Sequence, residues 1–496
     1  MEAVASASPA PTRSTFAVDL ALACGVGLLA ALCYAALRTE LSHEYDLYWM
    51  LPRLRDGDLV YPRHPLALPF AHALTEMLDG HGTLLERLRL ANGLCAAVAV
   101  GVVCLAARRL GADRARALLA AAAFGLLPAA VRFATVAELH GLFLPFASAA
   151  LWCVVGLVRR PGLAAAAVTG VACGVSAAVH ATGHLLVGVA LAWLVSTWWG
   201  RISAKRLVSA AALLLMSAAL VTVAVPLFVS GMEGAPVNDQ LDFVAEHPWA
   251  VDGLAALLFG EYLWPLLPLS LVWPLAALRL GGRAGCAAAV TLAGSFAVYL
   301  VGCAKLFCWP THGYLLHEFG AYLMPLGMVV AAVAATAVRP RSLAACALVA
   351  ALASGFDYGQ NVGYAPDRAF GAAAHRYLEG HDVRLLAGDR AEFEGLYERL
   401  YEVPALDALR DRVIPLASFV YEARRLKAEL KPDELALWFH PGISSPRPTV
   451  ITERAREQLR ALGGAFRECD EVWLPRIFAL EPVEVGALRG VLLRPR

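Results

Sequence analysis

Long apolar runs alternate with short polar segments along most of the chain. Roughly 20 apolar residues cross a bilayer as an α-helix, and on this criterion the sequence predicts about eleven transmembrane helices. Many of the runs are rich in alanine, and such small residues let membrane helices approach one another closely. The expected spans are 16–36, 91–107, 115–133, 138–157, 163–180, 183–199, 207–230, 262–280, 285–303, 319–337 and 342–356.

The first polar segment, 37–90, follows the first expected span. Within it, apolar residues recur at helical spacing from Leu66 to Leu78, with His72, Thr75 and Glu76 between them. This pattern predicts an amphipathic helix at the membrane surface.

The C-terminal 357–496 has more charged residues and shorter apolar runs than the rest of the chain. Runs typical of strands occur at Val383–Leu386, Leu435–Phe439 and Glu471–Leu474. Helical patterns alternate with them at 367–378, 390–401, 418–430 and 453–462. We therefore expect a transmembrane domain at 1–356 and a small soluble α/β domain at 357–496.

Composition supports this division. The chain is 59% hydrophobic and only 17% charged, which favours an α-helical polytopic membrane protein. Its net charge is +1, from 42 Lys and Arg against 41 Asp and Glu, so no overall field would attract nucleic acid.

Basic residues occur in every second loop between the expected spans. Because basic loops stay in the cytoplasm, this alternation predicts a cytoplasmic N-terminus in the cell (inner or plasma) membrane. Loop 37–90 and the C-terminal domain are then extracytoplasmic. The basic residues concerned are Arg108, Arg109, Arg114, Arg116, Arg159, Arg160, Arg201, Lys205, Arg206, Arg279, Arg283, Arg339 and Arg341.

Two carboxylates, Glu44 and Asp46, follow the first span at its outer edge, among aromatic residues. In a helix they would point to different faces, whereas in an extended segment they would share one side. The alternative is a solvated loop beside an aromatic belt at the membrane interface.

Further ionisable residues fall near the outer ends of the expected helices. Such residues at membrane depth are costly, which makes each a candidate for function. In the alternative reading Arg132 pairs with Glu138 and Lys305 extends to the interface. The set comprises Arg132, Glu138, His140, His180, His184, Glu261, Lys305, His312, His317 and Glu318.

Together these residues describe a site that opens away from the cytoplasm and contains both acids and cations. Arg132 and Lys305 could neutralise a phosphate at the membrane surface. Asp46 could accept the proton of an incoming hydroxyl group. Phosphate binding combined with a general base suggests group transfer from a phospholipid-like donor.

At this point the sequence resembles the GT-C superfamily of integral membrane glycosyltransferases. Members place an acidic pair in the first extracytoplasmic loop, and Glu44-Tyr45-Asp46 matches the E-x-D form of that pair. His64-Pro65, Ala137 to His140 and the segment from Val179 to Leu185 are similar to the protein O-mannosyltransferase-like branch.

The resemblance implies inverting transfer of a sugar from a polyprenyl-phosphate donor to a glycan, lipid or protein acceptor. Asp46 would be the general base, with Glu44 as the runner-up, and Arg132, Lys305 and His312 would hold the donor phosphate. No cofactor is certain. Some relatives bind a divalent metal through the acidic pair, and His43 and His64 could then supply further ligands. The residues assigned to the substrate cavity are His64, Glu138, His140, His180, His184, Glu261 and His317.

Two other classes of protein are alternatives to a transferase. A transporter or flippase of a lipid-linked or anionic substrate would use the same ionisable residues along a translocation path, but its usual paired interrupted helices are missing from the pattern. A non-catalytic membrane scaffold would tolerate replacement of the outer acids.

Overall fold

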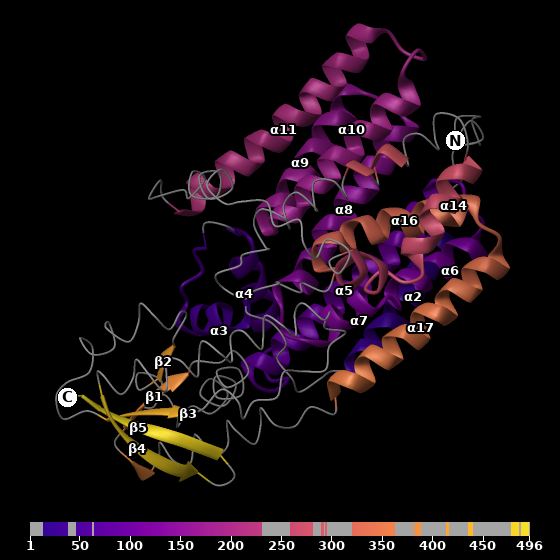
Figure 1. Cartoon of the computed structure of the whole chain (residues 1–496). Coiled ribbons are helices and arrows are strands. Elements are labelled where there is room, and N and C mark those ends of the chain that lie inside the picture. Colours follow the sequence, from indigo (N-terminus) through magenta and orange to yellow (C-terminus); the bar gives the residue numbers. More distant parts are fainter. Residues whose placement is uncertain are drawn as a thin grey trace.

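The computed structural model describes residues 13–37, 46–61, 64–230, 258–280, 289–291, 293–294, 320–362 and 380–381, and five strands between 383 and 495. It is a helical bundle with a small sheet beyond it (Figure 1). The helices of the bundle are α2 (Arg13–Ala36), α3 (Asp46–Asp56), α4 (Ala67–Met77), α5 (Leu84–Arg109), α6 (Arg114–Gly125), α7 (Pro128–Thr135), α8 (Leu139–Arg159), α9 (Leu163–Val179), η1 (Ala181–Gly183), α10 (His184–Trp198), α11 (Ala204–Ser230), the π-helical turn η2 (Leu258–Leu263), α14 (Leu269–Leu280), η4 (Ala321–Leu323), α16 (Met324–Ala337) and α17 (Pro340–Val362).

Six of the described helices are long and apolar enough to cross a membrane, or seven if the bent pair α6 and α7 is counted as one span. Three shorter apolar helices, Leu163–Val179, Leu269–Leu280 and Ala321–Ala337, fall at other expected spans. The predicted count of about eleven is thus supported in part, and most of the expected span 285–303 lies outside the described residues.

The expected span at 115–133 is present as a bent pair of helices. The chain forms two helices there, α6 and α7, which bend by 63° at a short break. The break falls at Leu127, directly before Pro128, which occupies the first turn of α7. Proline disfavours helical geometry in the residue before it but is accepted at a helix start, so a new helix begins in a new direction.

Glycines bring α9 and α11 together. A Cβ atom at Gly170 would lie 2.8 Å from the Cβ of Ser217, and one at Gly174 would lie 2.8 Å from the carbonyl oxygen of Ala218. The two glycines are four residues apart and so share one helix face. This is the small-xxx-small packing typical of membrane helices, where lipid removes the hydrophobic drive for association.

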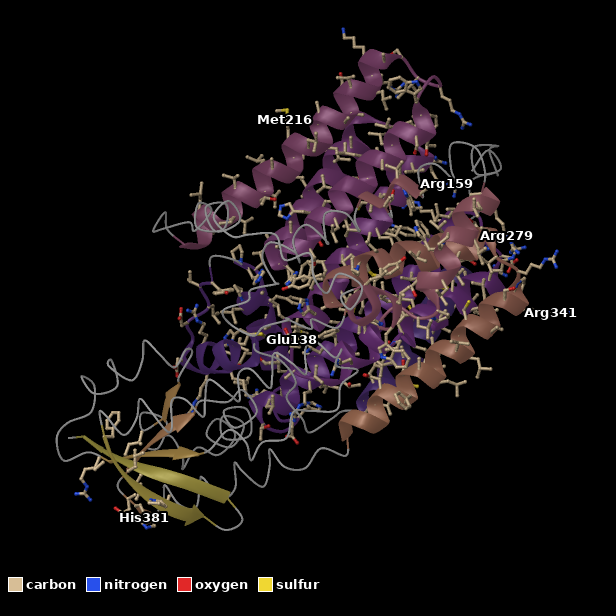
Figure 2. The ribbon with its side chains drawn as sticks, in the orientation of Figure 1. Glu138, Arg159, Met216, Arg279, Arg341 and His381 are labelled. Atoms are coloured by element: carbon tan, nitrogen blue, oxygen red, sulfur yellow. The ribbon has the colours of Figure 1, made fainter. Side chains whose placement is uncertain are left out.

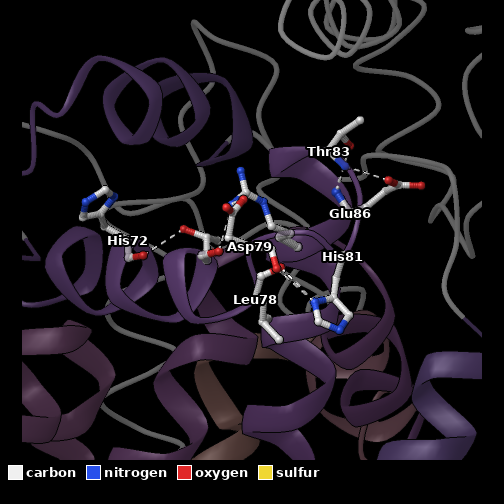
Figure 3. A network of polar contacts seen from close by, with 8 residues as sticks. His72, Leu78, Asp79, His81, Thr83 and Glu86 are labelled. Carbon is white, nitrogen blue, oxygen red and sulfur yellow. Dashed lines mark hydrogen bonds and ion pairs between the residues drawn. The ribbon is translucent and has the colours of Figure 1, made fainter.

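The predicted amphipathic helix of the first loop is present as α4, and polar contacts fix it to the start of α5 (Figure 3). Arg87 of α5 donates to the carbonyl oxygen of Thr75 at 3.1 Å and to the carboxylate of Asp79 at 2.8 Å. Helix α5 itself begins with a reciprocal cap, in which Thr83 and Glu86 each bond the other's backbone N–H. The first loop is therefore anchored to the bundle over 66–87.

Arginines gather at one end of the bundle, which we call the basic end. Figure 2 places Arg159, Arg279 and Arg341 along this end, and α8, α14 and α17 each have a terminus there. Asp19 near the start of α2 reaches Arg108 at 3.1 Å and Arg114 at 3.0 Å, so these termini meet at the same end. The basic loops expected on one side of the membrane thus converge in space.

The C-terminal strands form one mixed sheet in the order β2-β1-β3-β5-β4. β1 (Val383–Ala387) pairs in parallel with β2 (Val413–Pro415) and β3 (Leu435–Phe439). β5 (Leu488–Pro495) pairs antiparallel with β3 and with β4 (Phe478–Val485). Two of the three expected strands are present as β1 and β3.

The third expected strand, 471–474, and the helical patterns at 367–378, 390–401, 418–430 and 453–462 lie outside the described residues. Helix α17 continues to Val362, past the expected end of the last span at 356. The sheet, marked by His381, lies at the opposite end of the molecule from Arg341 (Figure 2).

Candidate functional site at the histidine end of the bundle

A short turn between α7 and α8 carries two of the expected site residues. Glu138 caps α8, because its Oε1 accepts the backbone N–H of Leu139 at 2.7 Å. His140 follows in the first turn of α8, and both side chains are only 1% exposed. The cap thus fixes a carboxylate and an imidazole at one end of the helix.

Asn92 of α5 holds this turn in place. Its side-chain amide donates to the carbonyl oxygens of Val136 and Glu138, each at 2.7 Å. Gly141 lets α8 approach, since a Cβ atom there would lie 2.8 Å from Asn92 Cγ and would overlap the carbonyl oxygen of Phe133. Sequence reasoning did not select Asn92, although a buried amide in an apolar run is the signal by which it could be found.

His180 lies at the turn between α9 and α10 and is 3% exposed. Its Nδ1 is 2.8 Å from the Thr182 hydroxyl and accepts the Thr182 backbone N–H at 3.3 Å. Since Nδ1 accepts a hydrogen bond, the neutral ring carries its proton on Nε2. Burial, then His140 and His64, lowers the pKa of His180 well below its ordinary value.

Three expected site residues meet at this turn. The rings of His64 and His180 are stacked, with centroids 4.7 Å apart and planes 9° apart. His140 approaches His180 edge-on at 4.5 Å. We call His64, His140 and His180 the histidine cluster. Two charged rings at the stacking distance would repel by roughly 3–4 kcal/mol at an effective dielectric of about 20, so at most one of the stacked pair is charged near neutral pH.

Aromatic rings enclose the histidine cluster. Tyr322 of η4 lies 5.3 Å from His140 and 5.5 Å from His180. Phe133 contacts His140, Phe143 contacts His180, and Tyr61 contacts His64. The two tyrosines were not predicted. They belong to segments far apart in the sequence, and nothing in a single sequence indicates that such segments meet.

The first loop reaches the cluster through its backbone as well as through His64. The N–H of Leu66 donates to the carbonyl oxygen of Ala178 at 3.2 Å, which joins the start of α4 to the end of α9. The loop that contains the candidate acids is therefore in direct contact with the ends of the spans.

Buried positive charge lies close to the cluster along the chain. Arg132 is 7% exposed in the last turn of α7, next to Phe133, which contacts His140. Arg89 on α5 is 5% exposed, one turn before Asn92. Cations so deep in a membrane bundle are retained where they are paired or used, which makes Arg132 a candidate for binding an anion.

The other expected site residues are less well placed or lie outside the described part. His184 is exposed, and its Nδ1 bonds the carbonyl oxygen of Ala181 in its own turn at 2.7 Å, so it does not join the cluster. Asp46 is the first residue of α3, and Glu261 is in η2. Glu44, Lys305, His312, His317 and Glu318 lie outside the described residues.

The possible divalent metal stays a prediction. Within the described ranges, no three His, Cys, Asp or Glu side chains are arranged to hold a metal ion. His64, one of the expected additional ligands, is stacked on His180, and the other, His43, is outside those ranges.

The histidine cluster and the basic end lie on opposite sides of the bundle. His140 is in the first turn of α8 and Arg159 ends it, and a helix of 21 residues is roughly 30 Å long. That is about the thickness of the hydrocarbon core of a bilayer. The cluster therefore lies at the depth of one membrane surface when the arginines lie at the other.

Comparison with solved structures identifies a similar fold. The crystal structure of ArnT from Cupriavidus metallidurans bound to undecaprenyl phosphate matches with a TM-score of 0.58 and 16% sequence identity, over 97% of this chain and 98% of that one. The same protein in the apo state matches with a TM-score of 0.55 and 17% identity over the same shares of the two chains. The fold of this chain is thus similar to that of ArnT over nearly the full length of both chains.

Sequence comparison adds no relative. No family model matches the chain, and neither does any curated protein. The structural neighbours are ArnT, so the expected assignment to the protein O-mannosyltransferase-like branch is not confirmed.

Proposed function

We propose that the protein is an inverting glycosyltransferase that moves a sugar from a polyprenyl-phosphate donor to an acceptor at the histidine end of the bundle. The observation that carries the proposal is the fold, which matches over nearly its full length a protein crystallised with undecaprenyl phosphate. Buried ionisable side chains lie at one end of this bundle, and such groups at membrane depth are candidates for binding a charged lipid phosphate.

In this mechanism Asp46 is the general base that removes the proton of the acceptor hydroxyl group, and Glu44 is the runner-up. The acceptor oxygen attacks the anomeric carbon as the bond to the donor phosphate breaks, so the configuration inverts and no enzyme-bound intermediate forms. Arg132, with Lys305 and His312, stabilises the departing phosphate by charge. Asp46 begins α3, and α3 leads directly to the anchored part of the first loop.

The histidine cluster has a positioning part in this proposal. His64 lies between Tyr61 of the first loop and His180 of the bundle, so it fixes the first loop relative to the ends of α8 and α9. A loop held in this way keeps its general base at a constant distance from the phosphate site, which is what a reaction of two bound substrates requires.

The proposed sidedness follows from the basic end. Because basic loops are retained in the cytoplasm, the basic end faces the cytoplasm in this proposal, and the histidine cluster and the C-terminal domain face outward. The donor lipid would then be used at the extracytoplasmic leaflet.

The test has a binding arm and a turnover arm, both with the full chain in nanodiscs. Undecaprenyl phosphate should bind, as measured by native mass spectrometry, and polyprenyl-phosphate sugars should be consumed in the presence of a panel of acceptors. Asp46→Asn should keep donor binding but lower turnover by at least about a hundredfold, the usual contribution of a general base. Binding of no polyprenyl phosphate would refute the proposal.

A matched pair of histidine variants separates positioning from general damage. His140→Gln removes a ring of the histidine cluster, whereas His184→Gln removes an exposed ring that bonds only its own turn. We expect turnover to fall in the first variant and to stay at the level of the parent in the second. Equal effects would remove the cluster from the mechanism.

A further inference from the structure

Two carboxylates of the basic end are already paired with arginines. Asp19 of α2 binds both Arg108 and Arg114, and Asp113 binds Arg116 at 2.8 Å. The acids described in this region are thus committed to three of its cations.

Three neighbouring arginines have no such partner. Arg109 ends α5, Arg159 ends α8 and Arg160 follows it, and none forms a salt bridge within the described part of the chain. Arg159 reaches the end of α5 directly, since its Nη1 donates to the carbonyl oxygen of Arg109, and Arg160 is the next residue along the chain. Among the described residues, three arginines thus gather at this corner of the bundle without a carboxylate partner.

The guanidinium group of Arg109 is held in a fixed place. It stacks on the ring of Trp152 with 4.3 Å between Cζ and the ring centroid, and Nη1 donates to the carbonyl oxygen of Trp152 at 3.3 Å. Gly156 makes room for it, since a Cβ atom there would lie 2.9 Å from Nη2. Arg109 is thus laid along one face of α8.

Arg159 makes the reciprocal contact, from the end of α8 to the end of α5. Its Nη1 donates to the carbonyl oxygen of Arg109 at 2.8 Å, so a hydrogen bond joins the ends of α5 and α8. Trp198 of α10 closes the neighbouring side, where its Nε1 donates to the carbonyl oxygen of Val158 at 2.8 Å. Arg109 and Arg159 each donate one hydrogen bond to a main-chain oxygen, whereas a guanidinium group has five N–H donors.

The depth of this corner suits a lipid headgroup. Arg109 and Arg159 end two membrane-spanning helices, so their side chains lie at the boundary between hydrocarbon and headgroups. Tryptophan and arginine together are typical of that layer. The negative ends of the α5 and α8 dipoles favour the cations, but by only about 0.3–1 kcal/mol each, which leaves most of the charge to be neutralised from outside.

We infer that Arg109, Arg159 and Arg160, together with Trp152, form a binding site for the phosphodiester headgroup of an anionic phospholipid such as phosphatidylglycerol. The guanidinium groups donate hydrogen bonds to the phosphate oxygens, and the tryptophan ring contacts the glycerol and the first part of the acyl chains. The site lies roughly 30 Å from the histidine cluster along α8, so it is separate from the proposed reaction centre.

The main test removes charge at matched places of the same membrane face. The double variant Arg109→Gln/Arg159→Gln is compared with Arg339→Gln/Arg341→Gln, which removes two exposed arginines at the start of α17. Phosphatidylglycerol is titrated into the detergent-purified full chain, and bound lipid is counted by native mass spectrometry. We expect the apparent affinity to fall roughly fivefold for each arginine removed at the site, and to stay within about twofold in the control. Equal losses in both variants would overturn the inference.

A second variant tests geometry without changing charge. Gly156→Ala forces the guanidinium group of Arg109 off its position, and the shift is cheap for the fold because the group is the flexible end of a side chain. Phosphatidylglycerol binding should weaken while the melting temperature stays at that of the parent. Unchanged binding would show that the lipid responds to the overall positive charge and not to the position of the Arg109 guanidinium group, which would refute the inference.

The source of the phosphate is tested by competition. Excess inorganic phosphate should leave phosphatidylglycerol bound, because the acyl chains hold the headgroup at the membrane surface. Complete displacement would identify a site for soluble anions and would overturn the assignment to a lipid.

Discussion

Replacement of Asn92 by alanine tests whether the turn between α7 and α8 is held from α5. Asn92 is fully buried, and its amide group donates to two carbonyl oxygens, those of Val136 and Glu138. Asn92→Ala removes both bonds and leaves the rest of α5 unchanged, since alanine is the best helix former.

The two carbonyl groups are not equivalent, and this sets the magnitude. Glu138 is the N-cap of α8, and an N-cap carbonyl already accepts the first bond of its helix. Val136 follows the end of α7 in an extended conformation, so its oxygen has no helical partner of that kind. Leaving the buried Val136 carbonyl without a hydrogen bond costs about 1–3 kcal/mol of unfolding free energy. With a smaller loss at Glu138 and the space left by the amide, we expect a loss of about 2–4 kcal/mol in unfolding free energy.

The measurement is reversible unfolding of the purified protein in mixed micelles with increasing denaturing detergent. Ser196→Ala is the control, because the Ser196 hydroxyl bonds the Ala192 carbonyl oxygen within its own helix, where the helical bond remains after the change. Average side-chain bonds in membrane proteins contribute about 0.6 kcal/mol. A loss of that size for Asn92→Ala, or one equal to the control, would refute the reasoning that the turn depends on α5.

Two further predictions concern the same end of the bundle. Gly141→Ala should lower the unfolding free energy by about 1–3 kcal/mol, because the new methyl group would collide with the main chain of Phe133 and with Asn92; an unchanged value would contradict the close approach. Acidification should destabilise the protein through His180, whose pKa is lowered in the folded state by burial, His140 and His64. The folded state then binds a proton at His180 less readily than the unfolded state does. The contribution of neutral His180 to the unfolding free energy is therefore complete above the ordinary pKa of 6.5 and is lost as the pH falls below it. Melting temperatures should therefore fall between about pH 7 and 5, and His180→Gln should flatten that slope.

The membrane architecture could be predicted because lipid imposes a strict rule on sequence. Every span must be long and apolar, and the ends must carry polar residues. Helices α2, α8 and α11 consequently fall at the expected positions within a few residues, whereas α5 begins seven residues earlier than expected, at Leu84. The bend at Pro128 was missed although its signal was present, since hydropathy over 115–133 is continuous and conceals a proline at a helix start.

The site could be predicted as a list but not as an arrangement. His140 and His180 were singled out one at a time, by the cost of a polar group at membrane depth, and His64 was chosen through the resemblance of His64-Pro65 to a known family. Their contact depends on how α4, α8 and α9 pack, which no local pattern in one sequence encodes. His184 was chosen by the same rule, but its ring bonds the carbonyl oxygen of Ala181 in its own turn. The rule identifies how deep a residue lies in the membrane and not where its side chain points.

Several polar side chains in the described part of the bundle bond the backbone of a neighbouring helix. Lipid offers no water to helix-terminal carbonyl groups, so side chains from neighbouring helices reach them. Tyr34 donates to the carbonyl oxygen of Gly125 at 2.6 Å, as Asn92 does at Val136 and Trp198 at Val158.

The histidine cluster shows a second arrangement of buried polar side chains. Its rings contact one another, and those of His140 and His180 also contact the ring of Tyr322. Three imidazoles gathered from three separate segments carry a considerable cost in desolvation. Because ionisable groups at membrane depth are retained where they are paired or used, this cost supports the proposal that the substrates bind beside the cluster.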